Sequence, residues 1–452
     1  MSFPDHFSWG AAAASYQIEG AAEAHGKGPS VWDMFCKKAG ATWQGHSGSV
    51  ACDHYRLYAT DVAIMRELGL RAYRLSISWP RVLPDGIGSA NAAGLDFYDR
   101  LVDALLKAEV APYVTLFHWD FPLSLYEKGG WLNRDSSQWF AEYADVVTRR
   151  LSDRVTHFMT LNEPQVFIGA GHQDGRHAPG DRLHISEVLL AAHHVLMAHG
   201  RAVQAIRSAA VRPPSVGIAP VAQLSLPHEP THSHIEVARA ATFAAAQPHM
   251  RTNTWWLDPI CFGHYPEDGL AFHGADAPRV RDGDLELIHQ PLDYLGVNIY
   301  NGVPVRPGKD GRAENVPMPV GFPITAFDWP VTPEALYYGP KWLYERYKLP
   351  LVITENGLSC RDWVSVDGKV HDAARIDFTT RYLRELHRAI AEGVDVRGYF
   401  HWSILDNFEW AEGYKQRFGL VFVDYPTQQR IIKDSGYWYR DVIASNGAVL
   451  LA

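Results

Sequence analysis

Short apolar runs recur along the whole chain, and each is followed by a longer segment in which apolar residues repeat with the period of a helix. Eight of these runs have the length and the composition of a β-strand. They lie at Phe7–Ala12, Ala72–Ser76, Pro112–Phe117, His157–Leu161, Val216–Pro220, Leu292–Val297, Leu351–Thr354 and Arg397–His401.

Two of the intervening segments show the helical period most clearly. Gly94–Val110 places its leucines on one face and its charged residues on the other, and Asp377–Glu392 repeats this pattern before an expected stop at Gly393. Strands that alternate with helices predict parallel βαβ units, and eight such units predict a closed (β/α)8 TIM barrel, an α/β fold. We expect residues 1–452 to form this barrel as a single domain.

One long segment lacks any periodicity. Gly302–Pro330 contains six prolines and four glycines and lies between the sixth and seventh predicted strands. Its position predicts a long βα loop at the end of the barrel where the carboxyl ends of the strands meet. Thr42–Asp53 is expected to be a second loop of this kind.

Composition narrows the class of protein. The 452 residues are 47% hydrophobic, which is enough for a large core. The net charge of −9, without any basic run, argues against a nucleic-acid partner. The four cysteines show neither a disulfide framework nor a metal-site spacing. No apolar stretch is long enough to cross a membrane, and the first residues lack the pattern of a secretory signal, so we expect a cytoplasmic protein without membrane contact. The sequence gives no indication of oligomeric state.

Two short acidic motifs carry the candidate chemistry. Asn162-Glu163-Pro164 follows the fourth predicted strand, and Thr354-Glu355-Asn356-Gly357 overlaps the end of the seventh. Because a barrel gathers its strand ends around one mouth, the two glutamates are expected to face each other, as glycoside hydrolysis requires. The alternative is that each glutamate merely caps the helix that follows its strand.

Further motifs, in the same order along the chain, strengthen this interpretation. They are Phe7-Ser8-Trp9-Gly10, Gln17-Ile18-Glu19-Gly20, Phe117-His118-Trp119, His177-Ala178-Pro179-Gly180, Asn298-Ile299-Tyr300, Trp402-Ser403, Asn407-Phe408-Glu409-Trp410 and Arg417-Phe418-Gly419. Together with the two glutamate motifs, they make the chain resemble the β-glucosidases of glycoside hydrolase family 1 from Phe7 to about Trp438.

The resemblance implies a role for each catalytic group. Glu355 matches the nucleophile of a retaining mechanism, and Glu163 matches the general acid/base, whose pKa the charge of Glu355 should raise. Arg74 is expected beside the nucleophile, because a buried cation needs a partner. Tyr300 is expected to donate a hydrogen bond to Glu355, with Asn298 as a further supporting residue.

The resemblance also implies the contacts to the sugar in the −1 subsite. Asn162 matches the residue that holds the sugar 2-hydroxyl. The remaining candidates are polar partners for the other hydroxyls and aromatic walls for the ring. They are Gln17, His118, Trp119, Trp402, Glu409, Trp410 and Phe418.

Two departures from the family pattern fall near the aglycone side. Gln165 follows Asn162-Glu163-Pro164 where many members have tryptophan, and Asp328-Trp329-Pro330 replaces the usual Gly-Trp-Glu. Candidate aglycone contacts are therefore Gln165, His172 and Trp329.

The leading hypothesis is a retaining β-glucosidase that acts on small β-glycosides or short oligosaccharides, with some transglycosylation, and needs no cofactor and no metal. A 6-phospho-β-glycosidase is the alternative, disfavoured because the Glu409 carboxylate would repel a phosphate. A silent sugar-binding barrel would be expected to lose one glutamate. A metal-dependent barrel hydrolase is disfavoured because no HExxH or similar ligand set is present. The choice among glucose, galactose and fucose stays open.

Overall fold

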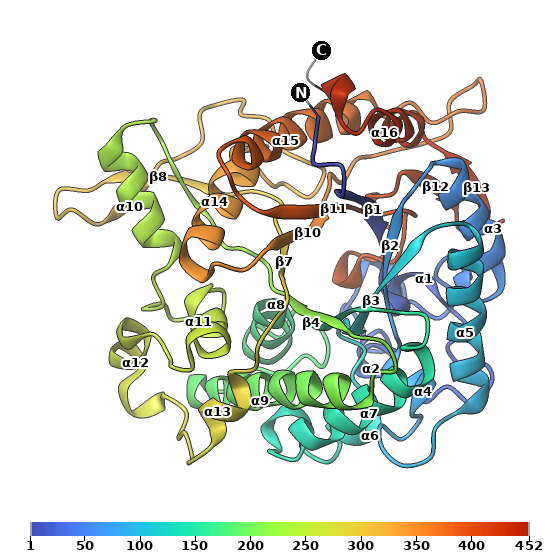
Figure 1. Cartoon of the computed structure of the whole chain (residues 1–452), viewed down its shortest axis with the longest axis horizontal. Coiled ribbons are helices and arrows are strands. Elements are labelled where there is room, and N and C mark those ends of the chain that lie inside the picture. Colours follow the sequence, from blue (N-terminus) through green and yellow to red (C-terminus); the bar gives the residue numbers. More distant parts are fainter. Residues whose placement is uncertain (1, 451–452) are drawn as a thin grey trace.

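The computed structural model describes residues 2–450. Eight parallel strands surround one axis, in the spatial order β5-β4-β3-β2-β1-β11-β10-β7 (Figure 1). Hydrogen bonds from Asp293 N to Val216 O and from Asn298 N to Pro220 O, both 2.9 Å, join β7 to β5 across the remaining gap. The predicted (β/α)8 barrel is therefore confirmed.

The barrel strands begin and end close to the predicted bounds. They are β1 (Ser8–Ala12), β2 (Ala72–Ser76), β3 (Ala111–Phe117), β4 (His157–Asn162), β5 (Ser215–Ala219), β7 (Leu295–Asn298), β10 (Leu351–Asn356) and β11 (Val396–Trp402). The largest difference is at β7, where Leu292–Tyr294 belong to the approach to the strand rather than to the strand itself.

Helices cover the outside of the barrel. The long ones are α3 (His54–Glu67), α5 (Ala92–Lys107), α7 (Ser136–Leu151), α9 (Ile185–Ala209), α14 (Ala335–Tyr347), α15 (Ala373–Ala391) and α16 (Asp434–Ala444). The two helices predicted from periodicity correspond to α5 and α15. Leu95, Leu101 and Leu105 of α5 are buried against the strands, as its pattern predicts.

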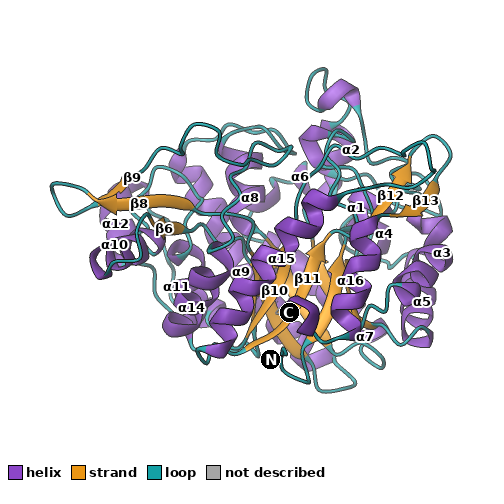
Figure 2. Ribbon diagram, turned by 90° about the horizontal axis from the view of Figure 1, so that it is seen from above, coloured by secondary structure: helices purple, strands orange, loops and turns teal. Residues whose placement is uncertain are grey.

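Shorter helices lie mainly in the loops. They are α1 (Ser15–Ile18), α2 (Val31–Phe35), α4 (Trp79–Val82), α6 (Leu123–Tyr126), α8 (Pro164–Ile168), α10 (His232–Thr242), α11 (Thr254–Phe262), α12 (Glu267–His273) and α13 (Asp284–Ile288). In Figure 2, α1, α2 and α8 lie together on the side to which the barrel strands point with their carboxyl ends. The loops that follow the strands therefore build one face of the molecule.

The segment Gly302–Pro330 is more ordered than the sequence indicated. It contains β8 (Val303–Pro307) and β9 (Ala313–Asn315), which form a small sheet with β6 (Ser225–Pro227). Pattern analysis missed these strands because they are short and rich in proline, and because their partner β6 is far away in sequence. A two-stranded sheet, β12 (Val421–Asp424) with β13 (Gln429–Ile432), lies at the other side of the barrel.

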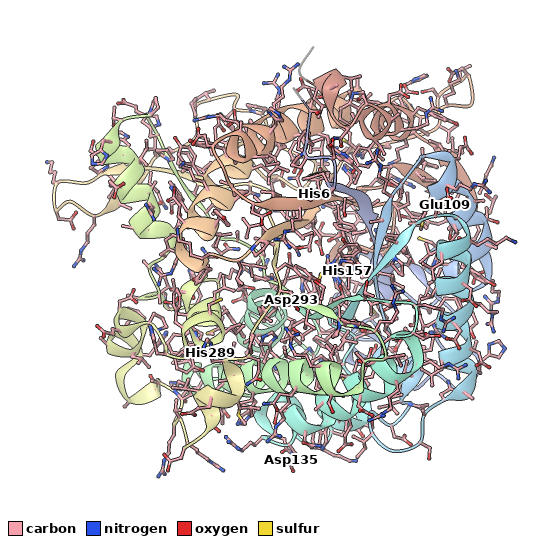
Figure 3. The ribbon with its side chains drawn as sticks, viewed as in Figure 1. His6, Glu109, Asp135, His157, His289 and Asp293 are labelled. Atoms are coloured by element: carbon pink, nitrogen blue, oxygen red, sulfur yellow. The ribbon has the colours of Figure 1, made fainter. Side chains whose placement is uncertain are left out.

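The opposite, amino-terminal end of the barrel is closed by packing. Figure 3 labels His6, Glu109, His157 and Asp293, all of which lie at or just before the starts of strands. Inside the barrel, Gly10 leaves no room for a side chain, since a Cβ there would lie 2.6 Å from the ring of Phe400. The interior is therefore a packed core below the site rather than a channel.

Candidate active site

A cavity of about 1100 Å³ opens at the carboxyl ends of the strands. Glu163 and Glu355 both line it, together with Tyr300, Trp402 and Glu409. The predicted long loop contributes Val303, Phe327, Trp329 and Pro330 to the wall. This is the face of a barrel at which active sites are found.

Glu355 ends β10 and is held through both of its carboxylate oxygens. Arg74 Nη1 donates to Oε1 at 2.5 Å, and the Tyr300 hydroxyl donates to Oε2 at 2.8 Å. Burial raises the pKa of Glu355 above its usual range, and Arg74 and the hydrogen bond from Tyr300 offset part of that rise. These contacts favour the ionised carboxylate in a site that otherwise disfavours charge.

Glu163 has different surroundings. Its single protein partner among residues 2–450 is Asn298, whose Nδ2 donates to Oε1 at 2.8 Å. Burial, and secondly the negative charge of Glu355, raise the pKa of Glu163 to about 8. The side chain does not cap α8, and the residue has a φ of 45°, a strained conformation for a side chain of this size. The capping alternative therefore does not describe Glu163.

A network of amides and one arginine connects the two carboxyl groups. Arg74 Nη2 donates to Asn162 Oδ1 at 2.6 Å, and Asn298 Nδ2 donates to the same oxygen at 3.0 Å. The Asn162 amide is 3.0 Å from His118 Nε2. A hydrogen bond from Asn298 also lowers the pKa of Glu355, so a single side chain acts on both carboxyl groups.

Gln17 and Glu409 lie together at another side of the base of the cavity, the part that holds the two glutamates. Gln17 Nε2 is 3.3 Å from Glu409 Oε2 and donates to Phe408 O at 2.8 Å. Burial, followed by the charges of Glu355 and Glu163, raises the pKa of Glu409 to about 8. Near neutral pH this carboxyl therefore carries little charge in the empty cavity, and the charge argument against a phosphate holds only at higher pH.

Aromatic rings form the walls around these polar groups. Trp410 packs on Trp119 with ring centroids 4.5 Å apart, and Trp402 stacks on His118 at 5.7 Å. On the other side, Trp329 lies 5.2 Å from Tyr300 and 6.2 Å from Phe418. Flat apolar faces beside hydrogen-bonding groups suit the two kinds of surface of a sugar ring.

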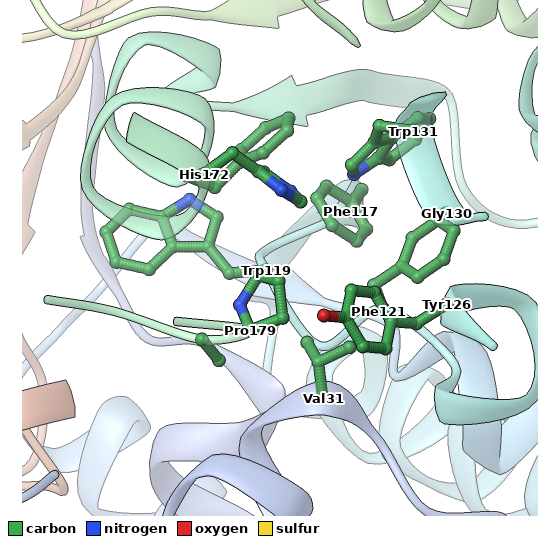
Figure 4. A pocket seen from close by; sticks show the side chains of 11 residues that line it. Val31, Phe117, Trp119, Phe121, Tyr126, Gly130, Trp131, His172 and Pro179 are labelled. Atoms are coloured by element: carbon green, nitrogen blue, oxygen red, sulfur yellow. The ribbon is translucent and has the colours of Figure 1, made fainter. Parts of the chain in front are cut away.

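Two of the candidate aglycone residues do not line this cavity. Gln165 is fully buried, and its Nε2 donates to Val221 O at 3.0 Å. Imidazole Nδ1 of His172 lies 2.9 Å from Asp181, and its ring faces a separate small cavity with Phe121 and Trp131 (Figure 4). Trp329 is the member of the three that reaches the catalytic cavity.

The cavity wall also contains residues that the sequence analysis did not single out. His177 occurs in one of the recognised motifs, but the others come from loops with no distinctive pattern. They are Lys38, Trp43, Arg176, Arg182, Gln223, Arg251 and Phe327.

The described part of the chain was searched for clustered metal ligands and for helices that could cross a membrane. Within residues 2–450, no three His, Cys, Asp or Glu side chains are grouped so that they could hold a metal ion. No helix of the same described region is long and apolar enough to cross a membrane.

A TIM barrel with two buried glutamates at the ends of β4 and β10, one hydrogen-bonded to an arginine and the other to an asparagine, defines a glycoside hydrolase. Comparison with known proteins agrees with this class. The model of glycosyl hydrolase family 1 matches residues 1–448. The chain belongs to glycosyl hydrolase family 1, as its motifs predicted.

Several relatives match over almost their whole length. The chain is 45% identical to a 1,4-beta-D-glucan glucohydrolase of Thermotoga neapolitana over 447 residues, covering 98% of this chain and 99% of the relative. It is 41% identical to a bifunctional beta-D-glucosidase/beta-D-fucosidase of Bifidobacterium breve, covering 99% of both. Among solved structures, a beta-glucosidase from Thermotoga maritima in complex with glucoimidazole superposes with a TM-score of 0.91 at 44% identity, covering 99% of both chains.

Proposed function

We propose that this protein is a retaining β-glucosidase that removes terminal, non-reducing β-D-glucosyl residues from small β-glycosides and short oligosaccharides. The observation that carries the proposal is the unequal environment of the two glutamates. Glu355 contacts a cation and a phenol that favour its ionised form, whereas burial and a neighbouring charge keep Glu163 protonated up to a pH of about 8. One carboxyl group is thereby ready to attack and the other ready to give a proton.

In the proposed first step, the Glu355 carboxylate attacks the anomeric carbon while Glu163 protonates the departing oxygen. This forms a covalent glycosyl-enzyme and releases the aglycone. Glu163, now ionised, then takes a proton from water, which displaces Glu355 with a second inversion. A second sugar in place of water would give transglycosylation.

We assign the surrounding residues to supporting roles. Arg74 and Tyr300 keep Glu355 ionised and oriented, and Asn298 positions Glu163. Asn162, Gln17, His118 and Glu409 are proposed to bind the glycone hydroxyls. Trp119, Trp402, Trp410 and Phe418 are proposed to form the apolar walls of the same subsite.

We further propose that residues 1–452 act as one catalytic domain and that the protein is cytoplasmic. All four cysteines are free, which is the usual state in a reducing compartment. Relatives named as glucan glucohydrolases support a place in the breakdown of cellulose fragments.

The anomer formed first tests the mechanism. Proton NMR of a fresh reaction on a β-glucoside should show β-glucose before mutarotation, and early α-glucose would contradict double displacement. A panel of nitrophenyl β-glucoside, galactoside, fucoside and glucoside 6-phosphate tests the glycone. Glucoside should be the preferred substrate, and a preference for the 6-phosphate would favour the phospho-β-glycosidase alternative.

A further inference from the structure

The outer part of the catalytic cavity is lined by cationic side chains, whereas the base of the cavity holds the two catalytic glutamates. Lys38, Arg176, Arg182 and Arg251, here called the basic wall, line the same cavity as the two catalytic glutamates. The lining has two other acidic residues: Glu409 lies at the base of the cavity beside Gln17, and Glu412 lies 3.1 Å from Lys415 and is therefore already paired. A chain with a net charge of −9 thus places a local excess of cations at its substrate entrance.

The basic wall is assembled around the loop 174–182. Arg182 packs over Gly175, where an added Cβ would lie 3.0 Å from the arginine Cγ. Lys38 Nζ donates to Pro179 O of the same loop at 2.9 Å. Arg251 joins from a distant part of the sequence, with its Nη2 3.2 Å from Asp174.

These cations share too few carboxylates. Asp174 faces both Arg251 and Arg176, the latter at 3.5 Å. Arg182 has no salt bridge among residues 2–450. Burial, and then the charge of Arg176, lower the pKa of Arg251, so the two arginines repel each other. An anionic ligand would relieve this repulsion, because a guanidinium binds a carboxylate or a phosphate through two parallel hydrogen bonds.

The basic wall lies next to the subsite proposed for the glycone. Trp410 packs on Trp119, and Trp119 packs on His177 with ring centroids 5.6 Å apart. Burial and the charges of Arg176 and Arg251 lower the pKa of His177 to about 3. The rings of His177 and Trp119 therefore connect the cations with Trp410 at the base of the cavity, and all of these residues line the same cavity.

We propose that the basic wall binds an anionic group, a carboxylate or a phosphate, carried by the aglycone of the substrate. The inference rests on the proposed β-glucosidase function and specifies which class of β-glucoside the enzyme prefers. In this arrangement the uncharged glycone lies at the base of the cavity, beside the two glutamates, and the anionic group of the aglycone lies toward the entrance.

A matched pair of substrates tests the proposal. Cellobionate and cellobiitol both carry a β-glucosyl group on the 4-oxygen of an open-chain aglycone, and they differ only in a carboxylate or a hydroxymethyl group remote from the bond that breaks. At low ionic strength, kcat/KM for cellobionate should exceed that for cellobiitol by roughly twofold to fivefold, the range of a partly exposed charge pair. The preference should appear mainly in KM and should shrink as salt is added.

Variants locate the effect. In the double variant Arg176→Ala/Arg251→Ala, the ratio of the two kcat/KM values should fall toward one, and turnover of cellobiitol reports that the variant is folded. Arg149→Ala is the control, because Arg149 is an exposed arginine paired with Asp145 on α7, outside the cavity lining. The same comparison of kcat/KM between cellobiose 1-phosphate and cellobiose tests a phosphate in place of the carboxylate, and is called the phosphate arm.

The outcomes separate the two proposals. Equal kcat/KM values within both pairs in the parent enzyme, cellobionate with cellobiitol and cellobiose 1-phosphate with cellobiose, would overturn the basic wall as an anion site. The same ratio in the double variant and in Arg149→Ala would overturn it too. Failure to hydrolyse both substrates and nitrophenyl β-glucoside would instead overturn the proposed function, and this inference with it. A response in the phosphate arm alone would assign the wall to phosphorylated aglycones, and a response to cellobionate alone to carboxylated ones.

Discussion

The base of the cavity and its basic wall differ in how their charged side chains are buried and paired. At the base, Arg74, Glu355 and Glu163 are buried and contact polar groups, as in Arg74 with Glu355 or Asn298 with Glu163. On the basic wall, the arginines are half-exposed or exposed. Arg176 and Arg251 share the carboxylate of Asp174, and Arg182 has no salt bridge within residues 2–450. The difference shows that the base is preorganised before any ligand arrives, whereas the wall keeps binding capacity for a ligand.

Backbone strain follows the same division. Glu163, Trp119 and Trp410 at the base have φ values of 45°, 81° and 50°. None of the four cations of the basic wall has a positive φ. Each left-handed residue costs on the order of 1–3 kcal/mol and persists only where packing imposes it. The base therefore uses part of the folding free energy to hold its side chains in place.

The largest expected effect comes from removing the nucleophile at the base. Glu355→Ala should stay folded and lose activity on nitrophenyl β-glucoside on the order of 10⁵-fold, because no other group can form the glycosyl-enzyme. Azide should restore turnover and give the α-glycosyl azide, since the small anion occupies the empty position. Identification of the azide product by NMR is the measurement, with azide-treated parent enzyme as the control. Near-normal activity without azide would show that another carboxylate is the nucleophile.

The second-largest effect is expected from Glu163, the proposed general acid, which lies on the other side of the base of the cavity. Glu163→Ala should lose about 10²–10⁴-fold on substrates with poor leaving groups, the usual contribution of a general acid. Dinitrophenyl β-glucoside needs little protonation, so its glycosyl-enzyme should form rapidly and then accumulate. Azide should release it as the β-glycosyl azide, the opposite anomer from that in Glu355→Ala.

The pH profile gives an independent measurement of the same residue. Activity requires Glu163 protonated and Glu355 ionised, so the parent profile of kcat/KM should be bell-shaped, with activity lost as the pH rises through about 8. Because the two groups are coupled, each limb belongs to the pair rather than to one residue. With the activated substrate, Glu163→Ala should lack the basic limb, and a limb that persists unchanged would contradict the assignment of Glu163.

The residues at the base of the cavity could be predicted from the sequence far better than those of the basic wall. Arg74 lies within the predicted strand Ala72–Ser76 and Glu355 directly follows the predicted strand Leu351–Thr354, so a barrel brings the two close together, and the family resemblance assigned their pairing. The basic wall combines Lys38, the loop 174–182 and Arg251, which no local pattern connects. His172 shows the same limit, since it was expected at the aglycone side but lines a separate cavity.

Substitution of Arg74 tests how far the ionisation of Glu355 depends on the Arg74–Glu355 ion pair. Arg74→Met should raise the pKa of Glu355 further, because the cation that favours the carboxylate is gone. Since the carboxylate is the active form, the acid limb of kcat/KM should move to higher pH and the bell should narrow. Breaking a buried ion pair should also destabilise the protein by about 3–5 kcal/mol. Arg74→Lys keeps the charge and should leave the acid limb closer to its original position. An unmoved acid limb in Arg74→Met would show that Arg74 does not control the ionisation of Glu355.

The smallest expected effect lies at the border between the two regions. Trp329 is half-buried, lines the cavity and packs on Phe327 with ring centroids 4.5 Å apart. Its free face is expected to pack on an aglycone ring, so Trp329→Ala should lower kcat/KM for cellobiose by roughly threefold to tenfold, the value of one lost aromatic contact. Methyl β-glucoside has no aglycone ring and should be nearly unaffected. Trp363→Ala is the matched control, because Trp363 is 70% exposed and does not line the cavity. Equal losses on cellobiose and methyl β-glucoside would mean that Trp329 acts through Tyr300, which it contacts, and thus belongs to the base of the cavity rather than to its aglycone side.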